Sequence, residues 1–111
     1  TFKENLFVPI GQGGWFEREG VRNYYDQQPI EAAYMIDALI LAYKTTRNDD
    51  YRKKAFQAFR WFTGDNTLKQ VVYNESTGGC HDGLGERTIN LNQGAESTLS
   101  YLLARVNMLE I

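Results

Sequence analysis

The 111-residue chain is poor in the features that mark several large classes of protein. It has one cysteine, Cys80, which cannot form an internal disulfide, and 2 prolines in a composition that is 42% hydrophobic and 14% aromatic. Disordered chains have the opposite profile, rich in proline and poor in apolar residues. A chain of this length holds one domain at most, so we expect residues 1–111 to be a single folded unit or a piece of one.

Strong charge of one sign is also missing. The sequence has 12 Lys and Arg against 14 Asp and Glu, and its longest basic cluster is residues 52–54, so nucleic acid is not an expected partner. The longest apolar run, residues 38–43, is far shorter than the ~20 residues of a membrane-spanning helix, so no membrane contact is expected. The start of the chain shows no basic and apolar leader, which together with the single cysteine favours a cytoplasmic location.

The sequence does contain an internal repeat, at a constant offset of 65 positions. Residues 13–31 (GGWFEREGVRNYYDQQPIE) and 78–96 (GGCHDGLGERTINLNQGAE) align without gaps and agree at six of nineteen positions, where chance would give about one. This predicts two units, about 1–65 and 66–111, each with a short strand, a Gly-Gly turn, a loop and a helix. The matched pairs are Gly13 and Gly78, Gly14 and Gly79, Gly20 and Gly85, Arg22 and Arg87, Gln28 and Gln93, and Glu31 and Glu96.

Cap residues and hydrophobic periodicity predict three helices. Pro29 suits the first helical position, which makes Gln28 the expected N-cap of a helix over residues 29–46 that is apolar around nearly its whole circumference. An amphipathic helix is expected over 50–63, ended by Gly64. A third is expected over about 94–109. Its apolar face consists of Leu99, Leu102, Leu103, Val106 and Leu109.

A helix buried on several sides, followed by an amphipathic outer helix, is typical of stacked helical hairpins. The expected fold class is therefore all-α, an arc of an (α/α) six-hairpin toroid with short β-like loops. The third helix lacks an outer partner in the sequence, so the flanks of the arc expect neighbours. Self-association is one way to cover them, because the helix over 29–46 carries more apolar surface than a monomer should expose.

Three strings resemble a known family: DQQPIEA at 26–32, GGCHDG at 78–83 and NLNQGAESTL at 90–99. They are similar to the C-terminal end of the six-hairpin toroid domain of bacterial group 1 glycosyltransferase-like proteins, over residues 13–103. The resemblance implies that the chain is the last portion of a longer protein that acts on carbohydrate, with the remainder of that protein as a partner. The nucleotide-sugar chemistry would belong to a different domain, so the fragment alone is not expected to be active.

Glu31 and Glu96 are candidate catalytic residues, because they occupy equivalent repeat positions one turn into successive helices. Two carboxylates across a cleft can serve as acid and as base or nucleophile in glycoside hydrolysis. The alternative is a repeated capping box, in which each Glu bonds the amide of its N-cap and Gln28 and Gln93 are the caps. In a glycan-binding cleft the two glutamines would instead contact substrate.

The loop between the second and third helices supplies two further catalytic candidates. His81, the only histidine, can move protons near neutral pH, and Asp82 follows it directly. The alternative is that Asp82 and Gly83 simply form a turn. No metal or cofactor is expected, because Cys80 and His81 fall short of the four ligands of a structural zinc.

Four residues complete the candidate substrate-binding set with the two glutamines. Trp15 and Tyr25 are expected as sugar platforms, or as aromatic residues that seal a loop onto the core. Arg22 and Arg87 match in the repeat and would bind an anionic ligand or brace their loops. The sequence thus predicts a contribution to a glycan-binding cleft, with a non-catalytic scaffold or oligomerisation module as the alternative.

Overall fold

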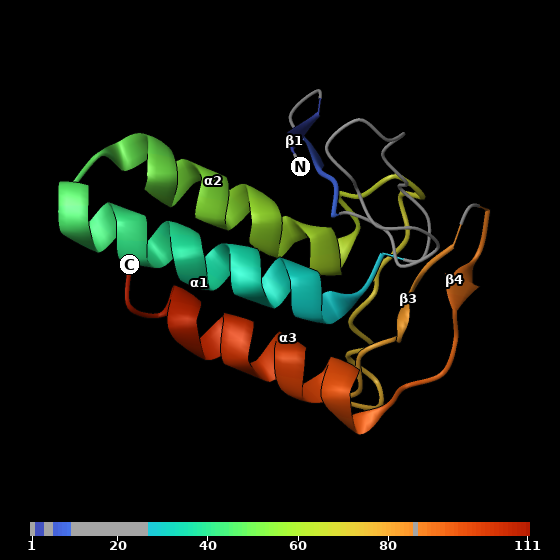
Figure 1. The fold of residues 1–111 in the computed structure, drawn as a ribbon. Coiled ribbons are helices and arrows are strands. Elements are labelled where there is room, and N and C mark those ends of the chain that lie inside the picture. Colours follow the sequence, from blue (N-terminus) through green and yellow to red (C-terminus); the bar gives the residue numbers. More distant parts are fainter. Residues whose placement is uncertain (1, 4–5, 10–26, 86) are drawn as a thin grey trace, which may run out of the picture.

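The computed structural model describes residues 2–3, 6–9, 27–85 and 87–111. Its helices are α1 (Pro29–Thr46), α2 (Asp49–Phe59), the 3-10 helix η1 (Arg60–Thr63) and α3 (Ala95–Met108). Its strands are β1 (Phe2–Lys3), β2 (Leu6–Phe7), β3 (Gly83–Leu84) and β4 (Ile89–Asn90). Helix α1 lies between α2 and α3 and contacts both; α3 runs parallel to α1, and α2 runs antiparallel to it (Figure 1).

The predicted helices are confirmed, with small shifts at their ends. Pro29 is the first residue of α1, and Arg47 ends that helix in a left-handed conformation at φ 57°. The side chain of Asn48 caps α2 by accepting a hydrogen bond of 3.0 Å from the amide of Asp50. Gly64 follows η1 at φ 119°, a conformation that only glycine adopts without strain.

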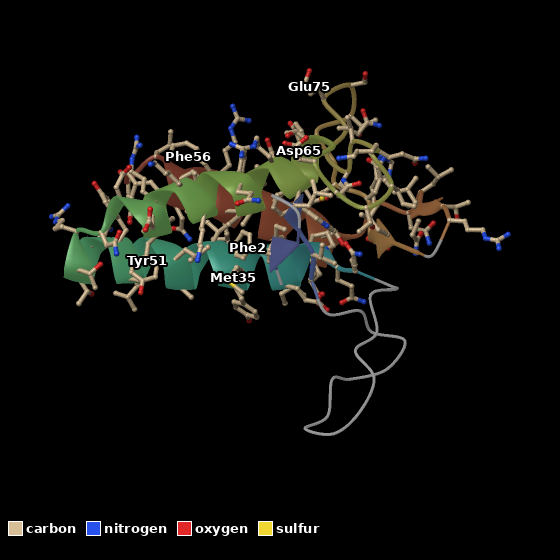
Figure 2. All side chains as sticks on the ribbon, turned by 90° about the horizontal axis from the view of Figure 1, so that it is seen from above. Phe2, Met35, Tyr51, Phe56, Asp65 and Glu75 are labelled. Atoms are coloured by element: carbon tan, nitrogen blue, oxygen red, sulfur yellow. The ribbon has the colours of Figure 1, made fainter. Side chains whose placement is uncertain are left out.

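The segments outside the helices form a folded layer at one end of the molecule. This layer, called the loop end below, comprises residues 2–3, 6–9, 27–28, 64–85 and 87–94 of the described chain. Strands β1 and β2 pair antiparallel, with Phe2 opposite Phe7, and β3 and β4 pair antiparallel, with Gly83 opposite Asn90. Two single bridges, between Gln27 and Leu84 and between Tyr73 and Cys80, extend this pairing. In Figure 2, Phe2 lies against the α1–α2 pair, where its ring packs on the hydrophobic core.

The expected all-α arc of a six-hairpin toroid is wrong. The described residues form a mixed α/β fold, with three α-helices, a 3-10 helix and two small antiparallel sheets. The short β-like segments that the sequence suggested as connections between hairpins are instead a packed β-containing end. Two backbone hydrogen bonds join Gln27, which precedes α1, to Leu84 in β3. In each, the amide nitrogen of one residue lies 2.8 Å from the carbonyl oxygen of the other.

The core lies where α2, η1 and the loop end meet α1 and α3. Trp61 and Phe62 are fully buried, and their rings pack edge to face with centroids 5.2 Å apart. Tyr73, from the loop end, stacks on Tyr101 of α3 at 3.9 Å between centroids. Aromatic contacts of this kind join the loop end to the helices.

Helix α3 packs with the face opposite to the one expected. Its buried residues are small or polar apart from Tyr101 and Met108: Ser97, Ser100 and Ala104 all lie inward. The residues of its expected apolar face are exposed, namely Leu99 (58%), Leu102 (43%), Leu103 (61%), Val106 (59%) and Leu109 (82%).

The inward serines of α3 are tolerated because both hydroxyl groups have partners. Ser97 Oγ donates to Asp82 Oδ1 at 2.9 Å, and Ser100 Oγ donates to the Glu96 carbonyl at 2.8 Å. Helix α1 also departs from the expected burial on several sides, since Tyr34 is 69% exposed and Leu41 66% exposed. Together, α1 and α3 leave a large apolar surface open.

Candidate functional sites

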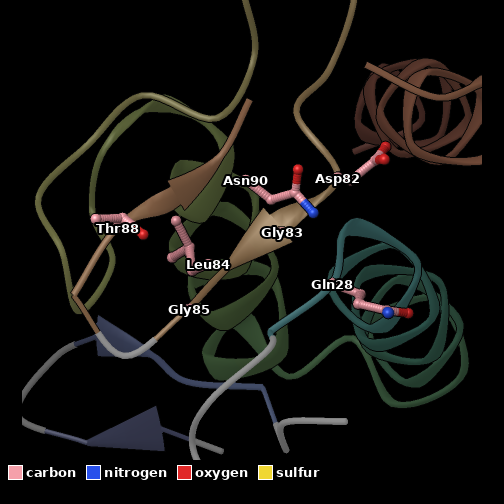
Figure 3. A pocket seen from close by; sticks show the side chains of 7 residues that line it. All are labelled: Gln28, Asp82, Gly83, Leu84, Gly85, Thr88 and Asn90. Atoms are coloured by element: carbon pink, nitrogen blue, oxygen red, sulfur yellow. The ribbon is translucent and has the colours of Figure 1, made fainter. Parts of the chain in front are cut away.

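A polar pocket lies where β3 and β4 meet the start of α1. Its volume is about 480 Å³, and Figure 3 shows the side chains that surround it. Two of the sequence-predicted site residues, Gln28 and Asp82, line it together. The full lining is Gln28, Asp82, Gly83, Leu84, Gly85, Thr88 and Asn90.

Gly83 is required at this pocket because two backbone segments meet there. A Cβ at this position would lie 2.5 Å from the carbonyl oxygen of Gln27, too close for any side chain. The close approach lets Gln27 and Leu84 exchange their backbone hydrogen bonds. The floor of the pocket is therefore fixed by backbone pairing.

Asp82 holds the start of α3. Its Oδ1 accepts hydrogen bonds from the amide of Gly94 at 2.8 Å and from the hydroxyl of Ser97 at 2.9 Å. The carboxylate thus caps a helix N-terminus from twelve residues upstream, where its charge is favourable. This contact gives Asp82 a structural role that neither the catalytic hypothesis nor the turn hypothesis included.

His81 points to a different pocket from its neighbour Asp82. It borders a hollow of about 460 Å³ with Thr63, Val71, Tyr73, Asn74 and Glu75. Its Nδ1 lies 3.2 Å from the carbonyl oxygen of Leu91. A carbonyl can only accept, so Nδ1 is the donor in this contact.

The two glutamates occupy the first turns of α1 and α3, as expected, but in different surroundings. Glu96 is exposed and lines a groove between the two helices, whereas Glu31 is half-buried. Gln28 is the N-cap residue of α1, as predicted, but the side-chain caps of the capping-box hypothesis are not observed. Gln28 makes no side-chain cap hydrogen bond, and the N-cap of α3 is Gly94 rather than Gln93.

Gln93 holds a neighbouring loop instead of capping α3. Its Oε1 accepts from the hydroxyl of Thr77 at 2.7 Å. Arg87 is exposed in the connection between β3 and β4. A hydrogen bond of 2.9 Å from the amide of Gly85 to the carbonyl of Thr88 closes this connection. The predicted binding residues Trp15, Arg22 and Tyr25 lie outside the described residues.

Gln27, beside the predicted Gln28, is a buried residue that no sequence pattern indicated. It is 1% exposed, and its Oε1 accepts from the indole Nε1 of Trp61 at 3.0 Å. Its Nε2 donates to the hydroxyl of Thr67 at 3.2 Å. A buried tryptophan needs an acceptor for its N–H, which is the only sequence signal that could have pointed to this residue.

Asn66 was also missed and is fully buried. Its Nδ2 donates to the carbonyls of Trp61 and Gln70, each at 2.8 Å. Its Oδ1 accepts from the amides of Leu68 and Gln70 at 3.1 and 3.3 Å. One side chain thus closes the turn that follows η1.

An apolar groove of about 510 Å³ runs between α1 and α3. Leu99 and Leu103 from α3 and Tyr34 from α1 contribute large exposed side chains to it. Its full lining is Ile30, Ala33, Tyr34, Asp37, Glu96, Leu99, Ser100, Leu103 and Asn107.

Cys80 is buried among the core residues and is a free thiol. Burial, with a smaller contribution from the charge of Asp82, raises the pKa of the Cys80 thiol from 9.0 to about 12. A thiol held in its protonated form is a poor nucleophile and a poor metal ligand. Within the described part of the chain, no three His, Cys, Asp or Glu side chains gather where they could hold a metal ion.

The chain matches no protein-family model and no curated protein. Among the described helices, none combines the length and apolarity that crossing a membrane requires. The geometry of the polar pocket and of the α1–α3 groove therefore carries the functional argument.

Proposed function

We propose that this chain is a non-catalytic interaction module that packs through the open surface of α1 and α3 against another protein surface. The carrying observation is the orientation of α3, which turns Leu99, Leu102, Leu103 and Val106 outward and serine and alanine inward. A helix in an isolated domain buries its leucines, and contiguous exposed leucines mark sites of interaction.

The size of the exposed surface supports this proposal. The large apolar side chains that α1 and α3 expose amount to on the order of 500 Å², taking about 120 Å² for a fully exposed leucine. A standard protein interface buries about 800 Å² on each partner, of which about 60% is apolar. The summed apolar area of these side chains is thus comparable with that of one ordinary interface. The side chains are Tyr34, Leu41, Leu99, Leu102, Leu103 and Val106 on the two helices, and Leu109 directly after α3.

A double substitution tests the proposal. Leu99→Gln with Leu103→Gln keeps helix propensity nearly constant, so we expect the circular dichroism spectrum and the melting temperature to change little. The wild-type chain should bind the apolar dye ANS several-fold more strongly than the variant. Dye binding that is equal in the two proteins, or a variant that no longer melts cooperatively, would contradict an open interaction surface.

Carbohydrate binding at the polar pocket is a second candidate function. It is favoured by the polar lining of the pocket, because the amide, carboxyl and hydroxyl groups of Gln28, Asp82, Thr88 and Asn90 suit sugar hydroxyls. This candidate keeps the proposed relation to a carbohydrate-active parent protein, in which the remainder of that protein would complete the cleft. A cytoplasmic setting belongs to the same proposal and is supported by Cys80, the single and buried free thiol.

A glycan titration with a pocket variant tests the second candidate. Asn90→Ala removes one exposed amide and the hydrogen bond that its Oδ1 accepts from the amide of Asn92, and it leaves the hydrogen bonds of Asp82 to α3 in place. We expect chemical shifts of the β3–β4 amides to move with added oligosaccharide in the wild-type chain and to move less in the variant. Identical shifts in the two proteins would exclude the pocket as a sugar site.

A further inference from the structure

We propose that the groove between α1 and α3 receives an amphipathic helix with cationic flanks from another polypeptide. The inference rests on the proposed interaction function and names the chemistry of the partner. Three features support it: the shape of the groove, its charge, and the division of the exposed leucines between two faces of α3.

The groove has the shape of a helix seat. The residues that α1 contributes are 30, 33, 34 and 37, and those from α3 are 96, 99, 100, 103 and 107. Both sets follow the i, i+3, i+4, i+7 spacing of one helical face, so the walls are two parallel ridges. A third helix fits between such ridges with its own apolar stripe inward, as in other helix-in-groove complexes.

The charge of the groove selects the partner. Asp37 and Glu96, one from each wall, are the charged residues that line it, and both are exposed. Asp37 Oδ1 accepts from Asn107 Nδ2 at 3.1 Å, so this hydrogen bond joins the two walls and holds the Asp37 carboxylate in the lining of the groove. Lysine or arginine flanking an apolar stripe would complement these carboxylates, whereas a second acidic groove would be repelled.

The exposed leucines of α3 are divided between two faces, which provides a matched control. Leu99 and Leu103 line the groove, whereas Leu102 is not among its lining residues although it is 43% exposed on the same helix. Leu102→Gln and Leu103→Gln therefore make the same chemical change at adjacent positions. A partner that binds in the groove should be weakened by Leu103→Gln and not by Leu102→Gln.

Two synthetic peptides serve as probes. Each has about 18 residues with leucines at i, i+3, i+4 and i+7, and they differ only in carrying lysine or glutamate beside that stripe. We expect the full chain to bind the lysine peptide at least tenfold more tightly, measured by fluorescence anisotropy at low salt. The difference should shrink as salt is added, because exposed charges are screened.

The variants decide where the peptide sits. Leu103→Gln should weaken lysine-peptide binding tenfold or more, Leu102→Gln should leave it within twofold, and Glu96→Lys should reduce the preference for lysine over glutamate. Unchanged secondary structure by circular dichroism is the condition for each comparison. Equal binding of the two peptides, or equal loss in the two leucine variants, would overturn the inference.

Failure of this inference and failure of the proposed interaction function would give different results. If the wild-type chain binds ANS at the open surface but not the lysine peptide, the interaction module stands and the cationic partner is wrong. If sedimentation shows a dimer that Leu103→Gln dissociates and Leu102→Gln does not, a second copy occupies the groove and the inference is also overturned.

Discussion

The loop end of the molecule and the open surface of α1 and α3 use polar and apolar side chains in opposite ways. At the loop end, Gln27 and Asn66 are buried with their amide groups hydrogen-bonded. On α3, Leu99 and Leu103 are more than half exposed. The first region satisfies its buried polar groups internally, whereas the second leaves its leucines exposed, which is the basis of the proposed interaction.

The reactivity of Cys80 tests how closed the loop end is, and its expected effect is the largest. The rise in its pKa from 9.0 to about 12 lowers the thiolate fraction at pH 8 by about a thousandfold. Reaction with a thiol reagent should be slower by that order in the native chain than in urea. Comparable native and unfolded rates would show that the loop end is open.

The same thiol makes stability depend on alkaline pH. Between pH 9 and pH 12 the unfolded chain releases the Cys80 proton while the folded chain retains it, so the free energy of unfolding falls as pH rises. Tyr101, whose pKa burial also raises, adds to this fall. Urea unfolding of Cys80→Ala over this range should show a shallower slope than the wild-type chain.

Asn66→Ala should destabilise the loop end strongly, although it changes no charge. It removes four hydrogen bonds and leaves the buried carbonyl of Trp61 without its side-chain donor. We expect a loss of about 3 kcal/mol in the free energy of unfolding. Urea denaturation measures it, and Asn74→Ala, whose Oδ1 bonds only an exposed amide at Ser76, is the matched control that should cost little.

Asp82→Ala should have a smaller effect, confined to the start of α3. Loss of the cap on Gly94 and Ser97 should cost about 1 to 2 kcal/mol, and Asp82→Asn should recover part of it because the amide oxygen still accepts. Hydrogen exchange of the first-turn amides of α3 measures the local effect. If exchange there is unchanged, the carboxylate is not a cap in solution.

Leu103→Gln should have the smallest effect on stability. An exposed leucine contributes little to the folded state, so the free energy of unfolding should change by less than about 0.5 kcal/mol. Ala104→Gln, at the adjacent and fully buried position, should cost several times more. Similar losses at the two positions would mean that the outward face of α3 is packed, and the contrast between the two regions would fail.

The helices could be predicted from the sequence because their signals are local. Pro29 at the first turn, Gly64 after η1 and the apolar periodicity of three segments act within a few residues of one another. The N-cap of α3 could not be predicted in the same way. Its side-chain partner, Asp82, lies twelve positions before Gly94 and is separated from it by a β-hairpin.

The orientation of α3 could not be predicted because periodicity identifies an apolar face and not what covers it. Ser97 and Ser100 can be buried because their hydroxyl groups donate hydrogen bonds to Asp82 and to the Glu96 carbonyl. Part of the candidate site was anticipated, since Gln28 and Asp82 line one pocket. Gln27 was not, because its role depends on Trp61, thirty-four positions away.

The three residues from Asp82 to Leu84 connect the starts of two helices, α1 and α3. Asp82 binds the start of α3, and Leu84 pairs with Gln27 immediately before α1. The connection between β3 and β4 can therefore change in length without moving either helix. One extra residue between Asp82 and Leu84 would shift α1 along α3 by about 3.3 Å, the rise of one extended residue. The groove-lining residues of the two helices would then no longer lie opposite one another.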